Sequence, residues 1–183
     1  MAAAKSSDAW RLLIYTVPSE PSRKRAFIWR ELKKAGAVYL RDGVCALPER
    51  QEAAEALAAV AAKVEEFGGE ATVIAAAKLP SVRAQAIIEA SRAARQQEYL
   101  DVADEAERFL EHVRRETEHR EFTFAELEEL EADLNKLRGW FEQIRRRDYF
   151  DVQEAGQVQA VLESCEEALN AFMEEASGLE VGR

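Results

Sequence analysis

The distribution of proline divides the 183-residue chain into two parts, because its four prolines all lie at or before Pro80. From Ser81 onward there is neither a proline nor a strand-like run, so we expect helices to the end. Apolar residues there recur at alternating spacings of three and four, which is the spacing of one helix face. These stripes run from Tyr99 to Thr117, from Leu127 to Ile144 and from Ala155 to Ala176. They predict an antiparallel bundle of three or so helices over residues 81–178.

Two capping boxes mark where the second and third stripes begin. Thr123 stands three residues before Glu126, and Asp151 stands three residues before Glu154. In such a box the short side chain accepts a hydrogen bond from a free N–H group of the first turn. A helix is therefore predicted to begin after Thr123 and another after Asp151.

Before Pro80 the pattern changes to short strand-like runs that alternate with two amphipathic helices. The expected elements are a strand over 10–17, a helix from Ser22 to about Ala35, strands over 37–40 and 44–47, a helix over 49–67 and a strand over 71–76. The first strand is apolar on both faces, as expected for a central strand. The two short strands are separated by Arg41-Asp42-Gly43, and an Asp-Gly pair is a strong hairpin signal. This β-α-β-β-α-β order predicts a ferredoxin-like α+β domain over residues 8–80.

The composition excludes several classes of protein. With 48% hydrophobic and 33% charged residues, the chain has the make-up of an ordinary globular protein. Cys45 and Cys165 are too few and too far apart for a secreted disulfide framework. The N-terminal residues are not expected to form a signal peptide, and no stretch is expected to span a membrane. We therefore expect a cytoplasmic protein with both thiols buried and reduced.

Charge is unevenly distributed along the chain. The formal net charge of −10 would by itself argue against nucleic-acid binding, because phosphates repel an acidic protein. Residues 1–80, however, contain 12 Lys and Arg against 10 Asp and Glu, whereas residues 81–183 contain 13 against 25. Between Pro21 and Arg41 seven basic residues accompany a single acidic one, Glu31. This segment is the one best suited to an anionic partner.

A helical wheel of the helix that begins at Ser22 separates an inward side from a basic side. The inward side, expected to face the sheet, contains Arg25, Ile28, Trp29, Leu32, Ala35 and Gly36. Cations beside an exposed aromatic side chain can neutralise phosphates and stack on bases, and the opposite side offers both. The residues predicted to contact DNA are Arg23, Lys24, Phe27, Arg30, Lys34 and Arg41. The alternative is a basic face that is only solvated.

The loop before this helix and the first helical turn form a second candidate site, for an anion. Its predicted residues are Ser19, Ser22, Arg23 and Arg25, with Ser22 as the expected N-cap. Free N–H groups, the helix dipole and two arginines can bind a tetrahedral oxyanion such as chromate or sulfate. The alternative is a capped helix start without a ligand. For Arg25 itself, the alternatives are a side chain that reaches past the core to the surface and one that holds an anion or a carboxylate.

No residue pattern indicates a metal site, a cofactor or a catalytic group. His112 and His119 are two helical turns apart, which is too far for both to bind one metal ion easily, so both are expected to be solvated. Cys45 lies among apolar residues of a strand and lacks the setting that activates a thiolate. We therefore expect a protein that is not an enzyme and needs no cofactor.

Residues 10–48 resemble the N-terminal domain of ChrB, the chromate-resistance regulator family. The resemblance rests on the run YTVPSEPSRKR, a following Trp-Arg pair and the run GAVYL; residues 122–150, which include FTFAELEELEADLNKLRGW, resemble the helical extension of the same family. It implies a cytoplasmic, chromate-responsive transcriptional regulator of a chromate-efflux operon. It also marks as candidates for operator or anion contact Arg23, Lys24, Arg25 and Arg30.

A more distant similarity connects the first part of the chain with the ferredoxin-like domain of PaaX-type repressors and with small CRISPR adaptation nucleases. Those nucleases hold a metal ion with an aspartate at the end of the first strand, where this chain has Thr16. A hydroxyl is a poor replacement for a carboxylate that binds magnesium, so DNA cleavage is not expected. The similarity is consistent with a dimer built through the sheet.

Taken together, these patterns predict a DNA-binding regulator that acts as a homodimer and contacts operator DNA through its first helix. The alternative is a module that senses an oxyanion or binds a protein partner, without DNA binding or catalysis.

Overall fold

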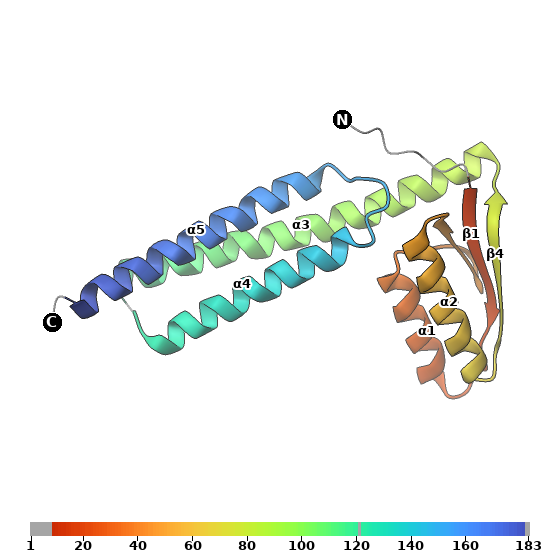
Figure 1. Ribbon diagram of the computed structural model, residues 1–183, viewed down its shortest axis with the longest axis horizontal. Helices are drawn as coiled ribbons and strands as arrows, with labels where there is room; N and C mark the ends of the chain where they lie inside the picture. The colour runs from red at the N-terminus through yellow and green to blue at the C-terminus, as the bar shows by residue number, and fades with distance from the viewer. Residues whose placement is uncertain (1–8, 121, 182–183) are drawn as a thin grey trace. The chain divides into compact units, whose positions relative to one another are not determined.

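The computed structural model describes residues 9–120 and 122–181, so residue 8, where the predicted ferredoxin-like domain begins, lies outside the described part. The chain forms two compact units. The first contains the described residues up to Ala93 together with Arg147–Asp151, and the second contains Ala94–Arg146 and the described residues from Val152 onward. The first unit combines a sheet with helices and the second is helical, so the predicted α+β class is confirmed (Figure 1).

The first unit is built on a four-stranded antiparallel sheet. Its strands are β1 (Ala9–Thr16), β2 (Val38–Arg41), β3 (Val44–Pro48) and β4 (Glu70–Lys78). Their order is β2-β3-β1-β4, so β1 is central, as its apolar faces predict. Leu13 of β1 pairs with Cys45 of β3 on one side and with Val73 of β4 on the other. Two helices, α1 (Ser22–Lys34) and α2 (Gln51–Glu66), connect the strands and lie on the same face of the sheet (Figure 1).

One core fills the space between the sheet and the two helices. Leu13 of β1, Leu32 of α1 and Leu57 of α2 are completely buried in it. Burial of each such side chain contributes about 1.5–3 kcal/mol to stability. A smaller core on the other face of the sheet joins Trp10 of β1 to Ile87, near the start of α3 (Ser81–His119).

Glycines end α1 and close the hairpin, as the sequence predicts. Gly36 follows the C-cap of α1 with a φ of 78°, and its N–H group donates to the carbonyl oxygen of Lys33 at 3.0 Å. In the hairpin, Asp42 and Gly43 form the two-residue turn, and Gly43 has a φ of 68°. Its carbonyl oxygen accepts a hydrogen bond from the Tyr15 N–H group at 2.8 Å. The turn is thereby fixed against β1.

The second unit contains three long helices around a core of their own. They are α3, from Ala94 onward, α4 (Phe124–Arg145) and α5 (Glu154–Val181). All three run side by side in Figure 1 with alternating directions. The predicted stripes supply the core, including the completely buried Tyr99, Leu130 and Cys165.

One predicted capping box is confirmed and the other is wrong. The Thr123 hydroxyl accepts a hydrogen bond from the Glu126 N–H group at 3.1 Å at the start of α4. Asp151, in contrast, has a φ of 51° and lies three residues before α5 begins. The neighbouring Tyr149 is buried in the core of the first unit, and its hydroxyl donates to the Ala35 carbonyl oxygen at 3.0 Å. The packing of Tyr149 therefore determines the backbone conformation of the segment that contains Asp151.

Both cysteines are free and buried. Within the described residues, the search for a helix long and apolar enough to cross a membrane finds none.

Candidate functional site

The N-terminal end of α1 carries an unusual charge for the start of a helix. Its first turn contains Arg23, Lys24 and Arg25, has no acidic residue and is not capped by a side chain. Because the N-terminal end of a helix is electropositive and its first N–H groups are free, cations there are unfavourable and anions are favoured. This end of α1 is therefore suited to bind a phosphate or another oxyanion.

The prediction that Ser22 caps α1 is wrong. Pro21 occupies the N-cap position with φ −77° and ψ 145°, and Ser22 is already the first helical residue. Proline has no side-chain acceptor, so the first N–H groups of α1 lack the hydrogen bond that a serine cap would provide. Both Ser19 and Ser22 are exposed.

A hollow of about 520 Å³ lies beside α1 and the β2–β3 hairpin. Arg25 and Trp29 line it from α1, and Arg41 lines it from the end of β2. Tyr15 of β1, Tyr39 of β2 and one acidic residue, Asp42 of the hairpin turn, also line it. Guanidinium groups bind oxyanions through paired hydrogen bonds, so two arginines at one concave surface favour an anionic ligand.

The two tyrosines of the hollow form a hydrogen-bonded pair. The hydroxyl oxygens of Tyr15 and Tyr39 are 3.0 Å apart, so one hydroxyl donates to the other. Burial raises the pKa of both phenols, and the hydrogen bond to Tyr15 raises the pKa of Tyr39 further. Both side chains are therefore neutral at physiological pH. Each hydroxyl group has one proton to donate, and one of the two is donated within the pair. The second hydroxyl proton can therefore be donated to an anion in the hollow.

The exposure of Trp29 and Phe27 is the reverse of what the helical wheel predicts. Trp29, expected to face the sheet, is 52% exposed and lines the hollow. Phe27, expected to be the exposed aromatic, packs edge-on against Phe67 with ring centroids 5.6 Å apart. Both expectations are wrong because α1 packs against α2 as well as against the sheet, so two of its sides are covered.

The other predicted cations of α1 differ in what surrounds them. Arg23 and Arg30 are exposed, as is Arg41 at the hairpin. Lys34 is exposed too, but its ammonium group donates to Glu31 at 2.7 Å. The basic side of α1 is therefore present as predicted, with one of its charges partly neutralised.

Lys24 is engaged with α2. Its Nζ donates to the carbonyl oxygen of Phe67 at 2.9 Å and lies 5.6 Å from the centroid of that ring. Phe67 is the C-cap of α2, where free carbonyl groups favour a cation. Lys24 thereby connects the start of α1 to the end of α2.

The hollow brings together residues that the sequence analysis assigned to different sites. Arg25 belongs to the predicted anion site and Arg41 to the predicted DNA surface, yet both line one hollow. The described residues that line it do not include Ser19, Ser22 and Arg23. Tyr15 and Tyr39 were missed, although Tyr39 stands two positions before Arg41, the spacing of one strand face.

A comparison with models of protein families decides the relationship of the chain. The family described as "Protein ChrB, N-terminal" matches residues 25–178, which is most of the chain. The chain belongs to this family. ChrB membership confirms the resemblance seen in the sequence and implies, at the level of the family, a regulator related to chromate resistance. No curated protein and no solved structure matches the chain.

The ChrB match includes most of the hollow and nearly all of the helical unit. Arg25, Trp29, Tyr39 and Arg41 lie within it, whereas Tyr15 lies before its first residue. The three-helix unit is therefore part of the ChrB N-terminal family and not an addition to it.

In the helical unit of this ChrB-family chain, the expectation for one of the two histidines is wrong. His119 is exposed, as predicted, but His112 is only partly exposed. Its Nε2 atom lies 3.5 Å from a carboxylate oxygen of Glu116 and 3.1 Å from one of Glu126. Glu126 belongs to the next helix, so the spacing of histidines along the sequence could not reveal the cluster.

Proposed function

We propose that this ChrB-family chain is a transcriptional regulator that binds operator DNA of a chromate-efflux operon through α1. The observation that carries the proposal is the exposed, cationic N-terminal end of this helix. Among the described residues, Arg23 and Arg30 have no ion-pair partner, so their charges remain available for phosphates. Phosphate contacts of this kind supply most of the affinity of proteins for DNA.

The energetics of α1 support an anionic partner. Three cations in the first turn oppose the helix dipole and so reduce the stability of the isolated helix. A phosphate at this end removes the unfavourable term and satisfies free N–H groups at the same time. The exposed indole of Trp29 adds a surface on which a base can stack.

A paired-variant experiment tests the DNA contact. We expect Arg23→Ala with Arg30→Ala to weaken binding to the promoter fragment of the chromate-efflux genes by more than about tenfold and to lower the salt slope by about two. The matched control is Arg114→Ala with Lys136→Ala, which removes the same charge from exposed positions of the helical unit. Equal losses in both variants, or no loss in the α1 variant, would contradict the proposal.

A second candidate function is oxyanion binding in the hollow, and the presence of both Arg25 and Arg41 among its lining residues favours it. Chromate and sulfate are tetrahedral dianions, which two guanidinium groups and a phenol hydroxyl can bind together. We expect sulfate and chromate to raise the melting temperature of the wild-type protein, and this shift to be lost in Arg25→Ala. Arg30→Ala, outside the hollow, is the control and should retain the shift.

Three further features belong to the proposed function. The first unit is a ferredoxin-like domain, which the order β2-β3-β1-β4 and two helices on one face support. The regulator is cytoplasmic and acts as a homodimer. Support for a partner surface comes from Ile14 and Ile74, which lie on neighbouring strands and are 43% and 39% exposed.

The proposed regulator acts without catalysis. Burial raises the pKa of the Cys45 thiol to about 12, and burial also raises that of Cys165, to about 11. Both thiols are therefore protonated at neutral pH, and only a thiolate is an efficient reductant or nucleophile. This supports a role in binding and not in reducing chromate.

A further inference from the structure

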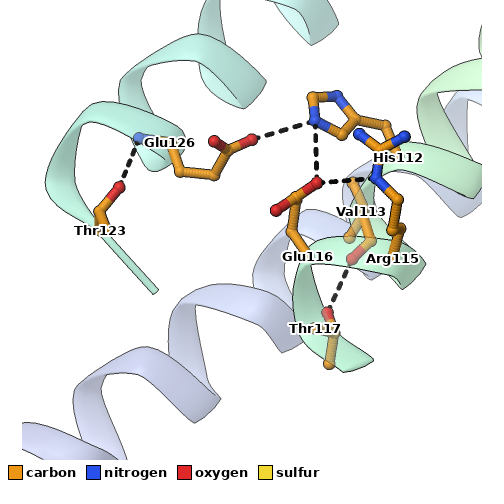
Figure 2. Close-up of polar contacts among 7 residues, drawn as sticks. All are labelled: His112, Val113, Arg115, Glu116, Thr117, Thr123 and Glu126. Atoms are coloured by element: carbon orange, nitrogen blue, oxygen red, sulfur yellow. Dashed lines mark hydrogen bonds and ion pairs between the residues drawn. The ribbon is translucent and has the colours of Figure 1, made fainter. Parts of the chain in front are cut away.

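A histidine and two glutamates from two helices converge on one point of the helical unit. His112 and Glu116 are four residues apart in α3 and so project from the same face of that helix. Glu126 comes from the first turn of α4, three residues after the Thr123 cap. Figure 2 shows both carboxylates directed at the same imidazole nitrogen.

The two separations that involve the imidazole nitrogen are those of ligands around one metal ion. With bonds of 2.0–2.2 Å, two ligands of a metal ion are about 2.9 Å apart at a right angle and about 3.4 Å apart at the tetrahedral angle. Nε2 of His112 is 3.1 Å from Glu126 and 3.5 Å from Glu116. One ligand atom of each of the three side chains lies within 4.8 Å of the other two.

Two further observations point to a ligand. Oε1 of Glu126, the atom 3.1 Å from Nε2 of His112, is buried, and among the described residues neither this contact nor any other gives it a hydrogen bond of good geometry. Glu116 is a buried carboxylate at 6% exposure, and its Oε1 atom receives one hydrogen bond, from Nε of Arg115 at 2.9 Å. Buried carboxylate oxygens that are not fully paired are costly, and a divalent cation would compensate both charges.

An ion can reach the cluster from solvent. His112 also lines a neighbouring hollow of about 270 Å³, whose other charged lining residues are Glu105, Arg108, Asp133 and Lys136. The side chains of His112 and Glu126 are 25% and 20% exposed. The cluster is thus sheltered but not sealed, as a metal site requires.

From this geometry we infer that His112, Glu116 and Glu126 form a binding site for a divalent transition-metal ion that links α3 to α4. One imidazole nitrogen and two carboxylates are a mixed nitrogen and oxygen set, which suits ions such as Zn²⁺ and Co²⁺. Three protein ligands leave at least one coordination position for water. Binding requires an unprotonated Nε2, so a proton carried by that nitrogen would pass to solvent or to Nδ1, and the metal would share the Glu116 carboxylate with Arg115.

The test uses the full chain, stripped of metal with a chelator, and titrates it with Zn²⁺ by calorimetry. We expect saturation at one ion per chain and a rise in melting temperature. His112→Ala and Glu126→Gln should each weaken Zn²⁺ binding by more than about tenfold. His119→Ala and Glu118→Gln, which alter exposed residues of the same helix, should leave binding unchanged.

Two additional readouts keep the inference falsifiable. Glu126→Gln preserves the size of the side chain, and His112→Cys should restore binding that His112→Ala loses, so a folding defect is distinguished from a lost ligand. Co²⁺ should give visible absorption bands without the thiolate charge-transfer band that Cys45 or Cys165 would produce. Titration without saturation at one ion per chain, an effect of His119→Ala equal to that of His112→Ala, or a thiolate band in the wild-type protein would each overturn the inference.

Discussion

Glu49 stabilises the place where the pairing of the central strand is irregular. Its carboxylate is ion-paired with Arg11 of β1, whose Nε donates to Oε1 at 2.9 Å, and its Oε2 accepts from the Ala76 N–H group at 2.8 Å. Ala76 has a φ of 52°, and the register of β1 with β4 shifts beside it, between Trp10 and Leu12. The Arg11 hydrogen bond first, and the Ala76 hydrogen bond second, lower the pKa of Glu49.

This interaction predicts a pH-dependent effect of Glu49→Gln. A carboxylate with a lowered folded-state pKa stabilises the fold above its unfolded value, and this contribution is lost as pH falls through the folded-state value. At neutral pH we expect Glu49→Gln to reduce the free energy of unfolding by about 1 kcal/mol. The difference between variant and wild type should shrink below about pH 4. Urea unfolding at both pH values measures it, and an undiminished difference in acid would contradict this role for Glu49.

At the scale of elements, the hairpin depends on a backbone that only glycine adopts easily. A Cβ atom at Gly43 would lie 2.5 Å from the Tyr15 carbonyl oxygen, and the φ of 68° disfavours other residues. We therefore expect Gly43→Ala to destabilise the protein by about 1–3 kcal/mol. Gly139→Ala, in the exposed interior of α4 with nothing near the added methyl group, should instead be neutral or stabilising by up to about 1 kcal/mol. Thermal unfolding measures both changes, and equal shifts would contradict the assigned strain.

The same elements show what a sequence can predict about this fold. Gly36, the Asp42-Gly43 pair and the Thr123 cap act through their own backbone or that of the next turn, so their effects are readable locally. The exposure of Trp29 depends on α2, which covers a different side of α1 from the sheet. The backbone at Asp151 likewise depends on burial of Tyr149, more than a hundred residues after the Ala35 carbonyl group it binds. The spacing of residues along the chain reveals neither of these dependences.

The candidate sites also divide into features that can be predicted from local sequence and features that depend on tertiary packing. The basic character of α1 is local and could be predicted from the sequence. The hollow needs β1, α1 and the hairpin to be placed together, so its Tyr15–Tyr39 pair could not be predicted. His112 and Glu126 lie close together only because the chain reverses direction between α3 and α4.

At the scale of the whole molecule, the uneven distribution of charge should set the balance between specific and non-specific binding in the proposed interaction with DNA. The strongly acidic residues 81–183 repel DNA, whereas the exposed cations of α1 attract it. Binding should therefore need a site that α1 contacts well, and it should be weak on unrelated DNA. This distribution reconciles the proposed DNA binding with a net charge of −10.

The central claim is tested most directly by titrating the wild-type protein with the promoter fragment of the chromate-efflux genes, at two salt concentrations, with and without chromate. The account predicts binding that is stronger than to unrelated DNA of equal length, weakens at the higher salt concentration and is released by chromate. Absence of binding at the lower salt concentration would contradict it and would favour the second proposal, oxyanion binding in the hollow.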